Sequence, residues 1–166
     1  MLVARELLNL VEDMVHALSR SGRDTVPEAA IQAQYIAIVC MLRSVGHVLK
    51  NVDCVDAADK QFLEAKWSTW KKEKVFTDFI EPTRNVLLKE FQARLRLRGS
   101  PDMHHVVSAD PNSRTGASVA AHFNPETLED MHGHKVMPRF RKAVCFWDTC
   151  LKEVEDFKSR GLQPRP

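Results

Sequence analysis

The sequence has little of several features that would identify a function. It contains no glycine-rich phosphate loop, no GxSxG elbow, no HExxH motif and no EF-hand loop, which excludes the commonest nucleotide, hydrolase and metal-site signatures. The paired Glu-x-x-His motifs of a di-iron helical bundle are absent too. The sequence also has no large excess of positive or negative charge, because its formal net charge is only +2. No global basic field therefore indicates a nucleic-acid-binding protein, although local basic patches remain open.

Cysteine motifs and long apolar runs are missing as well. The four cysteines form neither a CxxC pair nor zinc-finger spacing, so we expect buried free thiols in a reducing compartment; they are Cys40, Cys54, Cys145 and Cys150. Charged residues interrupt the apolar pattern near the N-terminus, which argues against a signal peptide. No run approaches the length of a membrane span. We therefore expect a cytoplasmic protein with no membrane contact.

What the sequence does contain is helix-period apolar patterning. Apolar residues at three- and four-residue intervals predict helices over Leu2–Ser19, Pro27–Val52, Asp56–Lys72 and Pro138–Arg160. The second of these is apolar over more than one face, which predicts a place at the centre of a bundle. The 166 residues suit a single domain, 1–166, that buries roughly two-thirds of its unfolded surface. We expect an all-α, up-and-down bundle of four to five helices that needs no metal, disulfide or cofactor.

The stretch Val75–Arg98 is the one around which we expect the chain to be organised. Its apolar positions follow a helical period, but Pro82 cannot donate to the carbonyl four residues back and restricts the residue before it. The pattern predicts a short helix over Val75–Ile80, followed by a kink or by a fresh helix with Pro82 in its first turn. Such a start would hold Arg84 and Asn85 near a helix N-terminus, where free amides and the helix dipole favour an anion.

A long segment, 99–135, lacks any sustained period and precedes the last helix. Loops of this length are usually functional or mobile. The segment carries five of the seven histidines, and His132 and His134 are candidate metal ligands together with a nearby aspartate. Because they lack the i, i+4 helical spacing that forms a site in advance, we expect loop or partner-contact histidines, with a metal-binding protein as a further hypothesis.

Two quoted stretches carry a family resemblance. MLRSVGHVLK (Met41–Lys50) and KWSTWKKEKVFTDFIEPTRNVLLKE (Lys66–Glu90) resemble the bundle core of HEPN-like proteins, which show an Arg-Ser on the second helix, a tryptophan-bearing helix and an RN-xxx-H motif on the third. The resemblance covers about two-fifths of the chain. In active members it implies RNA cleavage without metal, usually across a dimer cleft. Arg84 matches the arginine and Asn85 its polar neighbour, while Lys89 stands in the histidine position.

Lys89 changes what the resemblance implies. Histidine titrates near neutral pH and can serve as base and acid, whereas an unperturbed lysine stays protonated by a margin of about three pH units and can only hold a phosphate. We therefore expect a non-catalytic module in which Arg43, Arg84, Asn85 and Lys89 form an anion site, and we assign no residue a catalytic role. The expected ligand is RNA or another phosphate-bearing partner, the protein is expected to be a homodimer, and the cations must converge in space.

Two alternatives remain open. One is a metal-independent endoribonuclease in which His104 or His105 replaces the missing histidine. The other is a scaffold that binds a protein partner through an apolar surface patch and holds no anion. His47 is expected to be an ordinary satisfied or rim histidine, and Trp67 to be a packing residue.

Overall fold

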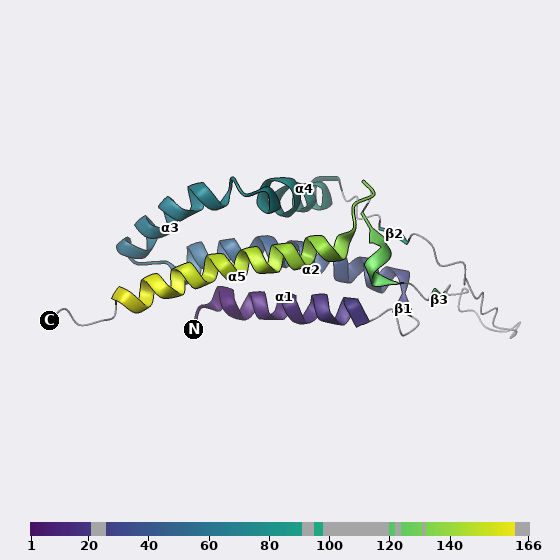
Figure 1. Ribbon diagram of the computed structural model, residues 1–166, viewed down its shortest axis with the longest axis horizontal. Helices are drawn as coiled ribbons and strands as arrows, with labels where there is room; N and C mark the ends of the chain where they lie inside the picture. The colour runs from purple at the N-terminus through teal and green to yellow at the C-terminus, as the bar shows by residue number, and fades with distance from the viewer. Residues whose placement is uncertain (21–25, 91–94, 98–119, 122–123, 131, 162–166) are drawn as a thin grey trace, which may run out of the picture.

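The computed structural model describes residues 1–20, 26–90, 95–97, 120–121, 124–130 and 132–161 (Figure 1). α-Helices dominate the described chain, which confirms the predicted all-α bundle: α1 Val3–Arg20, α2 Glu28–Val48, α3 Ala57–Trp70, α4 Glu81–Glu90 and α5 Val136–Gly161. The helix bounds agree closely with those predicted. The amphipathic periodicity was therefore sufficient to locate the helices.

Shorter elements connect the helices. Two of them are π-helical turns: η2, Leu49–Asp53, extends α2, and η3, Phe76–Ile80, precedes α4. A 3-10 turn, η4, covers Pro125–Thr127. Two-residue strands form two antiparallel ladders: β1 Val26–Pro27 with β3 Ala120–Ala121, and β2 Arg96–Leu97 with β4 Leu128–Glu129. Most of the predicted irregular segment 99–135 lies outside the described residues, and its described end consists of these turns and strands.

The helices pack as an up-and-down bundle with α2 at the centre. Figure 1 shows α1, α2 and α5 side by side, with α3 and α4 along one edge, and α2 contacts α1, α4 and α5. Among the described residues, one helical stretch, Ala29–Asp53, is long and apolar enough to cross a membrane by length and composition. The expectation that no run approaches that length was wrong. In this structure the buried apolar residues of α2 belong to the shared core of the bundle.

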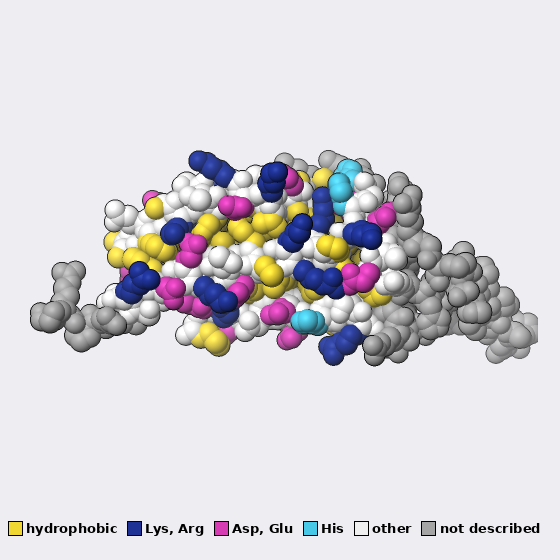
Figure 2. Space-filling model, viewed as in Figure 1, with side chains coloured by type: hydrophobic (Ala, Val, Ile, Leu, Met, Phe, Trp, Pro, Cys, Tyr) yellow, Lys and Arg dark blue, Asp and Glu magenta, His cyan; other side chains and the backbone are white. Residues whose placement is uncertain are grey.

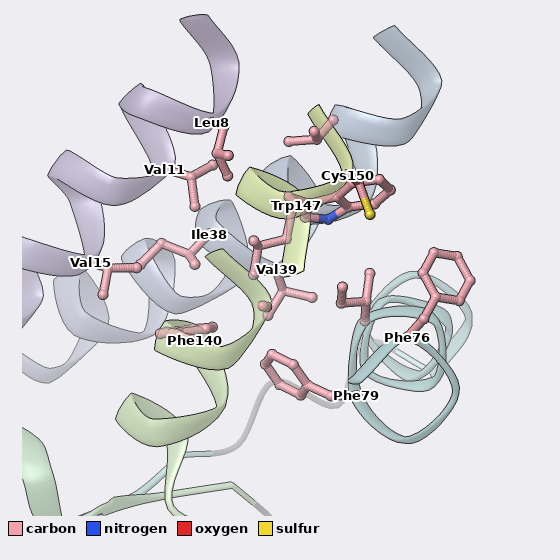
Figure 3. Packing of buried hydrophobic residues seen from close by; sticks show 14 of the residues in the cluster. Leu8, Val11, Val15, Ile38, Val39, Phe76, Phe79, Phe140, Trp147 and Cys150 are labelled. Carbon is pink, nitrogen blue, oxygen red and sulfur yellow. The ribbon is translucent and has the colours of Figure 1, made fainter. Parts of the chain in front are cut away.

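The core is formed by side chains from every helix and from η3. In Figure 3, Ile38 and Val39 of α2 lie between the α1 residues and the aromatic residues of α5 and η3. Trp147 and Phe140 of α5 have no exposed surface, and Phe76 is 1% exposed. Burial of large aromatic side chains supplies much of the stabilisation of a bundle this size.

The stretch around Pro82 adopts the predicted two helical pieces without a break between them. Glu81 has right-handed helical angles, and its amide donates to the carbonyl of Phe76. A π-turn joins each amide to the carbonyl five residues back, so the widened turn accommodates the proline, which has no amide hydrogen. Pro82 lies in the first turn of α4, as predicted, but η3 continues directly into that helix.

The cysteines differ in part from the expected burial. All four are free, and Cys54 and Cys150 are buried; burial raises the pKa of the Cys54 thiol to about 11. Cys145, expected to be buried, is exposed, and Cys40 is half-buried. Cys145 precedes the half-buried Phe146 and the buried Trp147 on α5, so its position in an apolar stretch did not determine which way it faces.

A glycine on α2 allows an aromatic cluster to form. A Cβ atom at Gly46 would lie 2.5 Å from Cη2 of Trp67 and 2.7 Å from Cη2 of Trp147. The ring centroids of these two tryptophans are 6.1 Å apart, and Trp67 also contacts Trp70 and Phe76 at 6.2 Å each. Only a residue without a side chain lets α3 and α5 approach α2 this closely.

We predict that Gly46→Val destabilises the protein by about 1–3 kcal/mol, the usual cost of forcing extra carbon atoms into a packed core. Urea unfolding followed by circular dichroism measures the change. Gly161→Ala is the control, because a Cβ there meets nothing within 4 Å. Equal midpoints for Gly46→Val and the wild type would contradict the close packing described here.

Candidate anion-binding site

Arg43 lies on α2 where that helix faces α4 and η3. Its guanidinium carbon is 5.6 Å from the centroid of the Phe76 ring, a distance typical of a cation–π contact. The Nη1 atom is buried and has no hydrogen-bond partner among the described residues. A buried donor left unsatisfied costs free energy, and more so when it is charged. Arg43 therefore keeps one unsatisfied donor within the packed side chains while its charge acts on the space between α2 and α4.

Arg84 and Asn85 lie on α4 and are both half-buried. Arg84 Nη1 donates to the Asn85 side-chain oxygen at 3.1 Å. The amide oxygen thus holds one arm of the guanidinium without neutralising its charge. Asn85 therefore has the role of orienting Arg84.

Arg43 and Arg84 are electrostatically coupled. Burial lowers the pKa of Arg43, the Glu81 carboxylate opposes this, and the positive charge of Arg84 lowers the pKa further. Within the described chain, the arginines that form ion pairs are Arg5, Arg139 and Arg141. Neither cation of the α2–α4 pair is neutralised by a described carboxylate in direct contact, so the pair carries an unbalanced positive charge.

Lys89 is the fourth residue of the predicted site. It belongs to α4, four residues after Asn85 and five after Arg84, which is one helical turn further along. Its side chain lies outside the described residues, so the convergence of Lys89 with the two arginines stays a prediction.

The predicted contribution of a free helix N-terminus is not found. Because η3 continues into α4, the amide of Glu81 is already bonded to Phe76, and Pro82 has no amide to offer. Any anion at this place is bound by side chains, not by a helix end.

His47, expected to be a satisfied or rim histidine, lies in the electrostatic field of both arginines. It lies one turn after Arg43 on α2, and its imidazole is exposed. Its pKa is lowered, mainly by burial and to a smaller extent by the positive charges of Arg43, Arg84 and Lys50. The i, i+4 spacing from Arg43 was a signal in the sequence, but only the packing of α4 against α2 brings Arg84 to the same place.

The second polar cluster surrounds Asp130, which is 6% exposed. Its carboxylate accepts hydrogen bonds from the amides of His132 and His134 at 2.9 Å each and from Arg139 Nη1 at 2.9 Å. These residues line a cavity of about 210 Å³ that also includes Tyr35. The described residues contain no group of three side chains placed to hold a metal. The carboxylate is therefore engaged in closing the turn.

Other sequence candidates lie outside the described residues. His104 and His105, the candidate replacements for the catalytic histidine, are among them. Figure 2 shows acidic and basic side chains interspersed over one face of the described chain. Charges of both signs thus alternate on that face, and an anion site depends on a local arrangement such as that of Arg43 and Arg84.

Comparison with known proteins finds no matching family, no matching curated protein and no matching solved structure.

We predict that Arg84→Ala raises the pKa of His47, because the substitution removes a positive charge that disfavours the imidazolium. NMR titration of the His47 ring protons measures this. In the wild type the folded-state pKa lies below the ordinary value near 6.5. The stability linked to His47 is therefore complete above that ordinary value and is lost as the pH falls from it through the lowered folded-state pKa. Arg20→Ala, at the exposed end of α1, is expected to leave the titration unchanged, and an unchanged curve in Arg84→Ala would contradict the proximity.

Proposed function

We propose that this protein is a HEPN-like, non-catalytic binding module that holds a phosphate group of RNA between α2 and α4, and that it acts as a cytoplasmic homodimer. The observation that carries the proposal is the pair formed by Arg43 and Arg84, which are electrostatically coupled and lack an ion-pair partner among the described residues. A bound anion would offset the repulsion between the two guanidiniums.

The choice of phosphate rests on the chemistry of the donors. Arginine presents a planar fork of N–H groups that matches phosphate oxygens in a bidentate fashion. Asn85 holds one arm of Arg84, and the Phe76 ring supports Arg43 from beneath. Both supports reduce the side-chain entropy that binding would otherwise cost. The choice of RNA within the phosphate-bearing ligands rests on the HEPN resemblance.

The absence of catalysis rests on Lys89 in the position of the family's histidine. A protonated lysine can hold a phosphate oxygen but does not withdraw a proton from a 2′-hydroxyl near neutral pH. A histidine is nevertheless available in the structure, because His47 is coupled to both arginines. Its lowered pKa keeps the imidazole neutral at pH 7, the form that can accept a proton.

That position of His47 supports a second candidate function, a metal-independent endoribonuclease. In this reading His47 on α2 takes the role first considered for His104 or His105. The binding module is the better supported of the two, because a single histidine supplies a base without a separate acid for the leaving group.

We predict that Arg84→Ala and Arg43→Met each weaken retention of labelled single-stranded RNA by about tenfold or more, since hydrogen bonds to charged groups contribute about 1.5–3 kcal/mol. Methionine keeps apolar contact with Phe76 while removing the donors. Filter binding in the presence of chelator measures the affinity, with Arg20→Ala as the matched control. Equal retention by all four proteins would remove the proposal.

The same samples, run on a denaturing gel, test cleavage. The binding module predicts intact RNA with the wild-type protein and with His47→Gln. Cleavage by the wild type that His47→Gln abolishes would instead establish the endoribonuclease. If the purified wild type neither retains nor cleaves RNA, the protein-partner scaffold becomes the better hypothesis.

A further inference from the structure

A second cavity lies between the end of α2 and the exposed side of α3. Its volume is about 380 Å³, and its lining is mostly apolar. The lining residues are Lys50, Asn51, Lys60, Leu63, Glu64, Trp67, Ser68 and Lys71. Small-molecule sites in proteins commonly enclose about 300–1,000 Å³ and combine apolar walls with a few polar groups. The size and character of this cavity fall within that range.

The apolar wall is formed by Leu63 and Trp67 and is fixed in position. Leu63 is 3% exposed. Trp67 is held by the tryptophan and phenylalanine rings around it, with its Cη2 atom against the backbone of α2 at Gly46. Such a wall needs little reorganisation when a ligand binds, so binding loses little conformational entropy.

The rim of the cavity is positively charged. Lys50, Lys60 and Lys71 contribute three positive charges and Glu64 one negative charge, which leaves an excess of two. The described lysines that form ion pairs are others, at positions 66, 152 and 158. The three ammonium groups at the rim are therefore exposed and unpaired within the described chain.

We propose that this cavity binds a small organic anion with an apolar body, such as a medium-chain carboxylic acid. The body would cover Leu63 and Trp67 and displace water from them, while the carboxylate would lie at the rim among the lysines. Lysine suits this role because its ammonium is a compact point charge that imposes no planar geometry on its partner. A neutral apolar compound lacks the charge complementarity, and a short acid lacks the apolar surface.

This site is separate from the arginine pair. It involves α3 and the end of α2, whereas Arg43 and Arg84 lie where α2 faces α4. Lys50, three residues after His47, lines this cavity and also acts electrostatically on His47. The variants used below leave Lys50 unchanged. A negative result for this cavity therefore says nothing about RNA binding by the arginine pair, and the two proposals can fail separately.

Decanoate, kept below its micelle concentration, is the probe, and titration calorimetry with tryptophan fluorescence gives its affinity for the full chain. Saturable binding of decanoate is expected, with decanol and acetate binding much more weakly. Lys60→Gln combined with Lys71→Gln is expected to weaken binding by about fivefold, the scale of two partly exposed ion pairs. Glu64→Gln is expected to strengthen it, because it removes the one repulsive charge. Lys142→Gln, an exposed lysine on α5, should bind like the wild type.

Three results would overturn the inference. Absence of saturable decanoate binding would exclude the site. Equal binding of decanol would show that the lysines have no part in recognition. Ser68→Phe puts an aromatic ring into the cavity, so undiminished decanoate binding by this variant would show that the ligand binds elsewhere. Arg84→Ala is the control outside the cavity and is expected to bind decanoate like the wild type.

Discussion

The close approach of α2 to the tryptophans of α3 and α5 is the constraint on which the rest of the structure depends. A Cβ atom at Gly46 would lie 2.5 Å from the Trp67 ring, so any side chain there would force the packed rings to shift. The aromatic rings packed there include Phe76, which supports Arg43. They also include Trp67, the wall of the cavity between α2 and α3. One packing requirement thus positions both places where a ligand is proposed.

The arginine pair shows how helix packing brings together two positive charges that isolated helices would keep apart and solvated. On its own helix each guanidinium would be solvated at modest cost. Placed between α2 and α4, Arg43 loses water from Nη1 without gaining a described hydrogen-bond partner, and Arg84 adds repulsion. A protein tolerates two neighbouring positive charges more readily when a bound anion offsets them. This is the physical reason for giving the pair a functional role.

Helix locations were predictable because they follow from local rules. The apolar period and the proline at position 82 predicted the helices and two helical pieces in the central stretch. Other predictions failed where the conformation or burial of a residue depends on the elements packed against it. The π-turn before Pro82 keeps the helix continuous, so no free N-terminus exists. Cys145 has apolar neighbours in sequence but faces outward, and Ala29–Asp53 has the composition of a membrane span although its buried residues belong to the bundle core.

The sequence by itself determined the all-α class, the helix ranges and the candidate cations Arg43 and Arg84, because periodicity and residue type are local properties. Only the tertiary structure decided which groups meet. It brought His47 into the field of both arginines, left Arg43 Nη1 without a partner and enclosed a cavity beneath three lysines. Each of these depends on how α2 is packed against α3 and α4, and that packing is set by contacts between residues far apart in the chain.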